Sequence, residues 1–208
     1  MNKGDDIMGW TSYHVAPIYK NGKQFIDRKA ECDRLFNCSM VNNLGKYEVL
    51  KSSMVGSTYY AAVKITTFAT ETEPEKVDVF AGIVLTAVNN KDYFNFSYKD
   101  MCESMGPCED NCPKGILDLL TPTDSEYANA WRKRCRKNLK KKYDLNALSN
   151  LPIGSIIKYT RPNGGEVELY KHPAGYQFKR PFWMSTDNSG YVATKHIPSN
   201  YVVVKRGE

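Results

Sequence analysis

Residues 123–143 read TDSEYANAWRKRCRKNLKKKY, and this stretch divides the chain into two parts of different composition. It predicts one helix, because Thr123 can cap the first turn and Glu126, three residues later, completes a capping box. Acidic residues then stand at the positive end of the helix dipole, and the lysines at 140–142 stand at its negative end. An apolar residue recurs every four positions, which predicts one buried stripe made of Tyr127, Trp131, Cys135 and Leu139.

The rest of this helix is basic, with eight lysines and arginines among the eleven residues 132–142. Charged helix faces are usually only solvated, but a strip this dense also suits phosphate backbones or an acidic protein. The apolar stripe must be buried against the parts before and after it, so only the outward cations are candidate contact residues. We predict a nucleic-acid or partner-binding site made of Arg132, Lys133, Arg136, Lys137, Lys140 and Lys141, together with Lys179 and Arg180 of the following part.

The chain of 208 residues allows one large or two small domains, and its 41% hydrophobic content is enough to form a core. The net charge of +6 conceals an asymmetry, because residues 1–123 carry a net charge of −3 and residues 124–208 a net charge of +9. An acidic-to-neutral part joined to a basic part points to polyanion binding. No apolar run follows the first charges, and the longest one, Val79–Val88, is too short to span a membrane. We therefore expect a soluble, cytoplasmic protein.

Six cysteines lie at positions 32, 38, 102, 108, 112 and 135, and without a signal peptide they predict reduced thiols. Four of them could supply thiolates to zinc, namely Cys102, Cys108, Cys112 and Cys135. Structural zinc sites usually show paired C-x2–4-C knuckles, however, and only the spacing from Cys108 to Cys112 fits. We predict no metal and no cofactor, and buried or loop thiols are the simpler interpretation.

The part before the basic helix predicts an α+β fold, in which a largely antiparallel sheet is covered by helices. Lys20–Lys23 is a tight-turn signal, Asp27 can cap a helix over Arg28–Cys38, and Gly56-Ser57 can join two strands as a hairpin. The predicted strands are 10–16, 47–55, 58–68, 79–88 and 93–98, and a short helix follows from Pro113 to Leu120. The first domain is then 1–143, and 144–151 is a linker.

Two segments of this domain have features that nucleic-acid sites use. The hydroxyl-rich segment Ser52–Tyr60 could cradle a phosphate, but it lacks the Gly-Lys-Ser/Thr ending of a P-loop. The alternating aromatics of Tyr93–Tyr98 could stack on bases, but they lack the glycines of the RNA-recognition motif. We expect a hairpin turn for the first segment and the core face of a sheet for the second.

Short strands and turn signals alternate from Pro152 onward, so residues 152–208 predict a small β-barrel with strands at 153–159, 167–170, 176–184, 191–194 and 201–204. Phe182–Met184, Gly190–Val192 and Ile197–Val202 resemble the tryptophan strand, distal hairpin and last strand of an SH3 domain. The N-terminal segment and acidic loop that complete the peptide groove of that family are absent. The resemblance implies an SH3-like barrel, with Trp183 and Tyr201 either lining a groove or filling the core.

A second resemblance rests on four segments: Gly9–His14, Asp27–Cys32, Leu50–Ala62 and Cys112–Lys114. They are similar to segments of a family of small accessory proteins carried by plasmids, integrative elements and phages of Gram-positive bacteria. Related mobile-element proteins include type II-A anti-CRISPR proteins, which disable Cas9 or its guide RNA. The resemblance implies a host-defence antagonist in the bacterial cytoplasm that binds a Cas9–guide RNA assembly. It transfers no catalytic residue to this chain.

Two other functions stay open from the sequence. The three histidines His14, His172 and His196 could move protons in a ribonuclease that acts on guide or other RNA, but no spacing ties them together. The SH3-like barrel could instead serve a protein-interaction adaptor. We predict a binding protein, name no catalytic residue, and leave its oligomeric state open.

Overall fold

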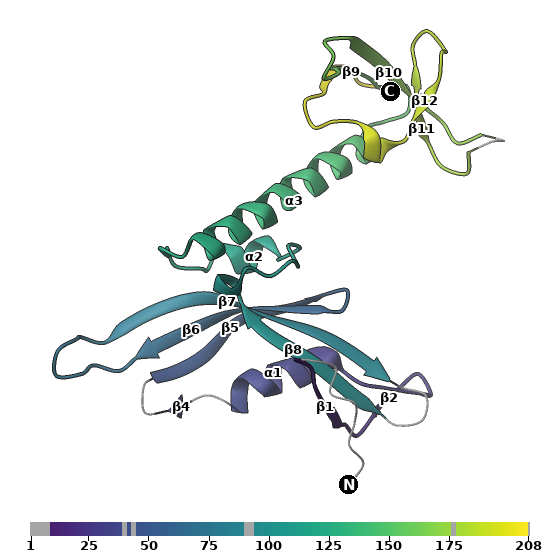
Figure 1. Cartoon of the computed structure of the whole chain (residues 1–208). Helices are drawn as coiled ribbons and strands as arrows, with labels where there is room; N and C mark the ends of the chain where they lie inside the picture. The colour runs from purple at the N-terminus through teal and green to yellow at the C-terminus, as the bar shows by residue number, and fades with distance from the viewer. Residues whose placement is uncertain (1–8, 39–40, 43–44, 90–93, 176–177, 208) are drawn as a thin grey trace. The chain divides into compact units, whose positions relative to one another are not determined.

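The computed structural model describes residues 9–38, 41–42, 45–89, 94–175 and 178–207 (Figure 1). They belong to two compact units that divide between Asn138 and Leu139. The N-terminal unit holds a six-stranded sheet and the C-terminal unit a five-stranded sheet, both antiparallel, so the predicted mixture of helices and antiparallel sheets is confirmed. Tyr93 and Tyr176, which were predicted to begin two strands, lie outside the described residues.

The N-terminal sheet has the strand order β1-β8-β7-β6-β5-β4, with the long strands β6 and β7 at its centre. The predicted hairpin at Gly56-Ser57 joins β5 to β6, with Val55 opposite Thr58. The strands are β1 (Thr11–His14), β4 (Val41–Asn42), β5 (Gly45–Val55), β6 (Thr58–Thr67), β7 (Lys76–Asn89) and β8 (Asn95–Cys102).

A separate hairpin joins β2 (Ile18–Lys20) to β3 (Lys23–Phe25). Its two turn residues, Asn21 and Gly22, both have positive φ, at 50° and 72°. A tight two-residue turn of the primed type needs this conformation at both central positions, and Asn-Gly is the sequence that adopts it most readily. The tight-turn prediction is therefore confirmed.

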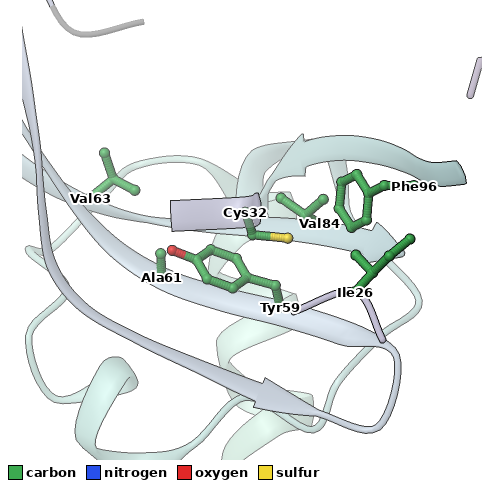
Figure 2. Close-up of a cluster of buried hydrophobic side chains, with 7 residues drawn as sticks. All are labelled: Ile26, Cys32, Tyr59, Ala61, Val63, Val84 and Phe96. Atoms are coloured by element: carbon green, nitrogen blue, oxygen red, sulfur yellow. The ribbon is translucent and has the colours of Figure 1, made fainter. Parts of the chain in front are cut away.

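Helix α1 (Arg28–Cys38) covers one face of the N-terminal sheet, as the sequence predicts (Figure 1). The Asp27 carboxylate accepts a hydrogen bond from the Ala30 N–H at 3.1 Å, which caps the first turn. Cys32 is fully buried in a cluster with residues of β6, β7 and β8 (Figure 2). A Cβ at Gly82 would lie 2.8 Å from Cζ of Phe36, so glycine at this position in β7 lets the helix approach the sheet closely.

The first six residues of strand β6 are buried on both faces, which agrees with the continuous apolar run Tyr59–Val63. Tyr59, Ala61 and Val63 pack in the cluster below α1. Tyr60 and Ala62 point to the opposite face and are also buried. There the short helix α2 (Lys114–Leu117) contacts β6, with Ile116 and Leu117 buried; it ends earlier than the predicted Leu120.

Helix α3 spans Glu126–Asn150, so the basic helix extends beyond the predicted end at Tyr143. The linker predicted for 144–151 is wrong, because Leu148 packs in the core of the C-terminal unit and holds this segment in helical form. The start of the helix also differs from the predicted capping box. The Ser125 hydroxyl, rather than that of Thr123, accepts a hydrogen bond from the Ala128 N–H at 3.3 Å.

Five strands in the order β12-β11-β10-β9-β13 form the sheet of the C-terminal unit. Its core contains Leu148, Leu169 and Trp183, all buried. The edge strands β12 and β13 are not paired with each other in the described residues, so this sheet is not closed into a barrel and the predicted SH3-like barrel is not confirmed. The strands are β9 (Ile156–Thr160), β10 (Glu166–His172), β11 (Phe182–Ser185), β12 (Tyr191–Val192) and β13 (Val202–Lys205), with a 3₁₀ turn, η2, at Thr194–His196.

A buried lysine of β10 holds the C-terminal end of α3 in this unit. Lys171 Nζ donates hydrogen bonds to the carbonyl oxygens of Ser149 at 2.7 Å and Leu151 at 2.5 Å. A cation at this position complements the negative end of the helix dipole and satisfies carbonyls that have no partner within the helix. Burial lowers the pKa of Lys171 below its ordinary value.

Candidate polyanion-binding surfaces

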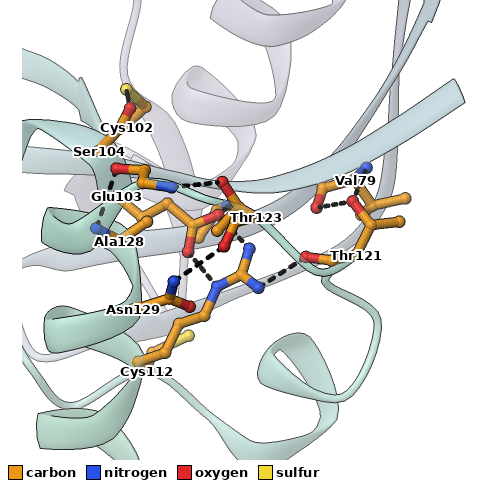
Figure 3. A network of polar contacts seen from close by, with 12 residues as sticks. Val79, Cys102, Glu103, Ser104, Cys112, Thr121, Thr123, Ala128 and Asn129 are labelled. Carbon is orange, nitrogen blue, oxygen red and sulfur yellow. Dashed lines mark hydrogen bonds and ion pairs between the residues drawn. The ribbon is translucent and has the colours of Figure 1, made fainter. Parts of the chain in front are cut away.

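Arg132 was predicted to be an outward cation, and the structure contradicts this prediction. Its side chain is buried, with 6% of the residue exposed. Nε lies 2.6 Å from Oε2 of Glu103, and one terminal nitrogen lies 2.6 Å from Oε1. Figure 3 shows the polar network around Glu103 and Thr121. The other terminal nitrogen donates to the Thr121 carbonyl at 2.6 Å. The guanidinium makes these three hydrogen bonds inside the N-terminal unit, so it is not an outward cation.

The buried face of α3 in the N-terminal unit is made of Ala128, Trp131, Arg132 and Cys135. The predicted stripe was right for Trp131 and Cys135 but wrong for Tyr127, which is 71% exposed. A spacing of three and four residues keeps side chains on one side of a helix better than a strict spacing of four. Trp131 Nε1 also donates to the Glu109 carbonyl at 2.8 Å, which holds α3 on the loop after β8.

The position of Glu103 follows from the end of β8. That strand stops at Cys102, opposite Gly82 of β7. The residues of β7 before Gly82 therefore have no strand residue of β8 opposite them. The Glu103 carboxylate accepts a hydrogen bond from the Ala81 N–H at 3.2 Å, and the Thr121 hydroxyl accepts one from the Val79 N–H at 3.0 Å. Side chains thus continue the hydrogen bonding of the sheet, and Arg132 neutralises the carboxylate that does so.

The remaining predicted cations of α3 are exposed. Lys133, Arg136 and Lys137 belong to the N-terminal unit, and Lys140 and Lys141 belong to the C-terminal unit. In the described part of the chain, no hydrogen bond or ion pair involves their side chains. Exposed cations without an internal partner can contact phosphates without first breaking a contact within the protein.

The other two predicted cations, Lys179 and Arg180, lie beside a row of aromatic rings in the C-terminal unit. In the register of β10 and β11, His172 lies opposite Phe182. Since Trp183 points into the core and side chains alternate along a strand, Phe182 and its partner lie on the outer face of the sheet.

Five rings make contact in sequence along this outer face, which we call the aromatic row. The ring centroids are 5.7 Å apart for Tyr170 and His172, 4.8 Å for His172 and Phe182, 4.3 Å for Phe182 and Phe178, and 4.8 Å for Phe178 and Tyr191. The sequence analysis did not find this row, although the rings of Tyr170 and His172, two residues apart in one strand, were a signal for it.

A cleft of about 420 Å³ opens at the end of the aromatic row and is lined by residues 178–182 and 191–194. Lys179 and Arg180 are exposed at this cleft, and none of its lining residues is acidic. Tyr191 is 63% exposed, so its ring is accessible from solvent. The cleft therefore combines flat apolar rings with uncompensated positive charge.

A second cleft, of about 550 Å³, lies in the N-terminal unit near the start of α3. Its lining includes Lys76, which forms an ion pair with Asp78 at 2.8 Å, and also Asp124. The charges of this cleft are balanced or acidic, so it suits a polyanion less well than the cleft beside Lys179.

Several residues considered as ligand-binding from the sequence have structural roles. Trp183 is completely buried and cannot line a peptide groove; it fills the core. Phe96 is buried with Phe94 and Tyr98 packed against it, so these aromatics form the predicted core face. In the hydroxyl-rich segment, Ser52 donates to the Asp33 carboxylate at 2.8 Å, in agreement with a structural hairpin.

The cysteines do not gather into a metal site in the described part of the chain, where no three His, Cys, Asp or Glu side chains are placed to hold an ion. Cys112 and Cys135 are buried, and Cys108 is exposed. Burial raises the pKa of Cys135 to about 11 and also raises that of Cys112. These two groups are therefore thiols rather than thiolates at neutral pH in the metal-free protein.

The three histidines are not connected by any hydrogen bond in the described structure. His14 is exposed on β1 in the N-terminal unit, and His196 is exposed in the C-terminal unit. The His172 ring stacks on Phe182, and its Nδ1 lies 3.0 Å from the Pro173 carbonyl oxygen. The ribonuclease hypothesis gains no specific support from these contacts and stays a prediction.

Comparisons of the chain with protein-family models, curated proteins and solved structures found no match. Among the helices of the described residues, none is long and apolar enough to cross a membrane.

Proposed function

We propose that this protein binds RNA through exposed cations of α3 and of the C-terminal unit. The observation that carries the proposal is the cleft beside the aromatic row, where Lys179 and Arg180 stand without an acidic neighbour among the lining residues. Lysine and arginine side chains that release counterions from phosphates supply most of the affinity of such sites. The net charge of +9 on residues 124–208 supports the same ligand.

The biological partner in this proposal is a Cas9-type effector with its guide RNA, and the protein is a host-defence antagonist of a mobile element. This part rests on the resemblance of Gly9–His14 and Leu50–Ala62 to mobile-element accessory proteins. The exposed cations of Lys133, Arg136 and Lys137 suit the guide RNA of such an assembly, since its phosphates are negatively charged.

The proposal is tested by measuring how tightly the full chain binds a guide RNA, Cas9 alone and their complex across a salt series. We expect binding to the RNA and to the complex, with an affinity that falls as salt rises. Lys179→Glu/Arg180→Glu should weaken it at least tenfold. Lys20→Glu/Lys23→Glu, the same charge change on the exposed β2–β3 hairpin, is the matched control and should have little effect.

Absence of binding to all three at about 50 mM salt would overturn the proposal, because phosphate contacts strengthen as salt falls. The same incubations, followed on a denaturing gel, test the ribonuclease alternative. That alternative is excluded if the RNA stays intact both with and without divalent metal. Binding to Cas9 alone that is insensitive to charge reversal would favour the protein-interaction adaptor. Since Trp183 is buried, such an adaptor would have to use another surface of the C-terminal unit.

A further inference from the structure

The aromatic row lies on the outer face of the C-terminal sheet and is not part of the hydrophobic core of that unit. The inner face already supplies the core with Leu169 and Trp183, both fully buried. Of the five rings, Tyr191 is 63% exposed and the other four are half-buried, so the row leaves part of its apolar surface in water. Exposed apolar surface that is rimmed by polar residues is characteristic of a binding site.

The charges around the row show which kind of ligand fits it. Lys179 and Arg180 stand at the same cleft as Phe178, Phe182 and Tyr191. Strand β10 carries two acidic residues, Glu166 and Glu168, and neither of them lines this cleft. Glu166 forms an ion pair with Lys158 at 2.6 Å. The ligand must therefore present flat apolar groups together with negative charge, and a nucleic-acid strand does both.

We infer that the aromatic row is a subsite for unpaired nucleobases, in which bases stack on Phe178, Phe182 and Tyr191 while Lys179 and Arg180 hold the adjoining phosphates. The inference rests on the proposed function and makes it more specific. In a duplex the faces of the bases are covered by their neighbours, whereas an unpaired segment can splay its bases onto aromatic side chains. Stacking on exposed rings tolerates any base, so the subsite selects single-stranded RNA rather than a sequence.

The subsite is tested by comparing the affinities of the full chain for single-stranded and duplex RNA of equal length at one salt concentration. An unstructured oligonucleotide should bind at least tenfold more tightly than the duplex. Tyr191→Ala should weaken single-strand binding about tenfold, which is the effect expected for loss of one stacking ring. The same change should leave duplex binding and the salt dependence nearly unaltered, because no charge is lost.

Two matched variants separate stacking from other effects. Tyr191→Phe keeps the ring and should retain the single-strand affinity. Tyr19→Ala removes a tyrosine that is 72% exposed in the N-terminal unit and should change nothing. Circular dichroism of each variant confirms that it is folded, and Tyr191 is exposed enough for its loss to leave the core intact.

The outcomes distinguish the subsite from the proposed function. If Lys179→Glu/Arg180→Glu weakens RNA binding but Tyr191→Ala does not, RNA binding stands and the stacking subsite is wrong. If neither the single-stranded RNA nor the duplex binds at low salt, both the proposed function and the subsite are wrong. If Tyr191→Ala weakens binding to Cas9 without guide RNA and leaves RNA binding unchanged, the row is a protein contact and the inference is overturned.

Discussion

Arg132 and Glu103, which are 29 residues apart in the sequence, form a two-pronged ion pair in the interior of the N-terminal unit, with both contacts at 2.6 Å. The pair joins the first half of α3 to the point where β8 ends. Arg132 is therefore not one of the exposed cations of the basic helix. It neutralises the Glu103 carboxylate, which accepts a hydrogen bond from the Ala81 N–H of β7.

Arg132→Met should destabilise the protein strongly. It leaves Glu103 as a buried charge without its partner, and we expect the free energy of unfolding to fall by about 3–5 kcal/mol. Urea denaturation followed by circular dichroism measures this loss. Arg136→Met, an exposed position on the same helix, is the matched control and should change the free energy by less than about 0.5 kcal/mol. Equal losses in the two variants would contradict a structural role for Arg132.

Glu103→Leu/Arg132→Met removes both charges and should recover part of the stability lost in Arg132→Met, because an apolar pair leaves no buried charge uncompensated. The recovery will be incomplete, since the Ala81 N–H then loses its acceptor. A double variant less stable than Arg132→Met would argue against this account.

The thiols should differ sharply in reactivity. Alkylation at pH 8 should label the exposed Cys108 and spare Cys112 and Cys135, whose pKa values are raised by burial, in Cys135 to about 11. Mass spectrometry of the digested protein reads the labelled positions, and the same reaction in urea should label all of them. Rapid labelling of Cys135 in the folded protein would show that this packing is wrong.

The same shift gives a pH dependence of stability. A pKa raised on folding contributes stability that is fully present below the ordinary thiol value of 9.0 and is lost as the pH rises through the folded value. The wild type should therefore become less stable between about pH 9 and pH 11. Cys135→Ala should show a weaker decline over this range, measured by urea denaturation. An identical decline in the variant would exclude a contribution from Cys135.

The lowered pKa of Lys171 predicts a pH dependence of stability with the opposite sign. Burial lowers its pKa on folding, so the unfolded chain binds this proton more tightly and stability rises as the pH approaches the ordinary value of 10.5. Lys171→Met leaves the Ser149 and Leu151 carbonyls without this donor and should cost about 1–3 kcal/mol. The difference in unfolding free energy between wild type and variant should grow with pH; a constant difference would contradict the lowered pKa.

The exposed cations of α3 should be visible in the salt dependence of RNA binding. For single-stranded RNA, log affinity decreases with log salt, and the steepness of this decrease is reduced by about 0.7 for each phosphate contact that is lost. Lys133→Ala/Lys137→Ala should reduce the slope if these side chains contact phosphates. Lys20→Ala/Lys23→Ala provides the control, and equal slopes in all three proteins would remove α3 from the binding surface.

Local signals predicted much of the fold. The Asn21-Gly22 turn, the Asp27 cap and the Gly56-Ser57 hairpin each depend on neighbouring residues only, and each is confirmed. The end of α3 could not be predicted in this way. Residues 144–150 were predicted to be a linker, but Leu148 packs in the C-terminal core and this tertiary contact extends the helix.

The candidate site was harder to predict because it depends on pairings distant in sequence. Arg132 lies in a run of cations, and only the position of Glu103 after β8 sets it apart from its neighbours. The aromatic row depends on the register that places His172 opposite Phe182, and on a ring contact between Phe178 and Tyr191. Counting charges along the sequence therefore found Lys179 and Arg180 but not the rings beside them.

The buried contacts of α3 also have an order in time, because a chain emerges from the ribosome from its N-terminus. The partners of Arg132, namely Glu103 and Thr121, have already been synthesised when the arginine appears. The far end of the same helix must wait for Lys171, which is translated after it and supplies the hydrogen bonds to Ser149 and Leu151. During synthesis, α3 is thus anchored at its beginning before anything can secure its end.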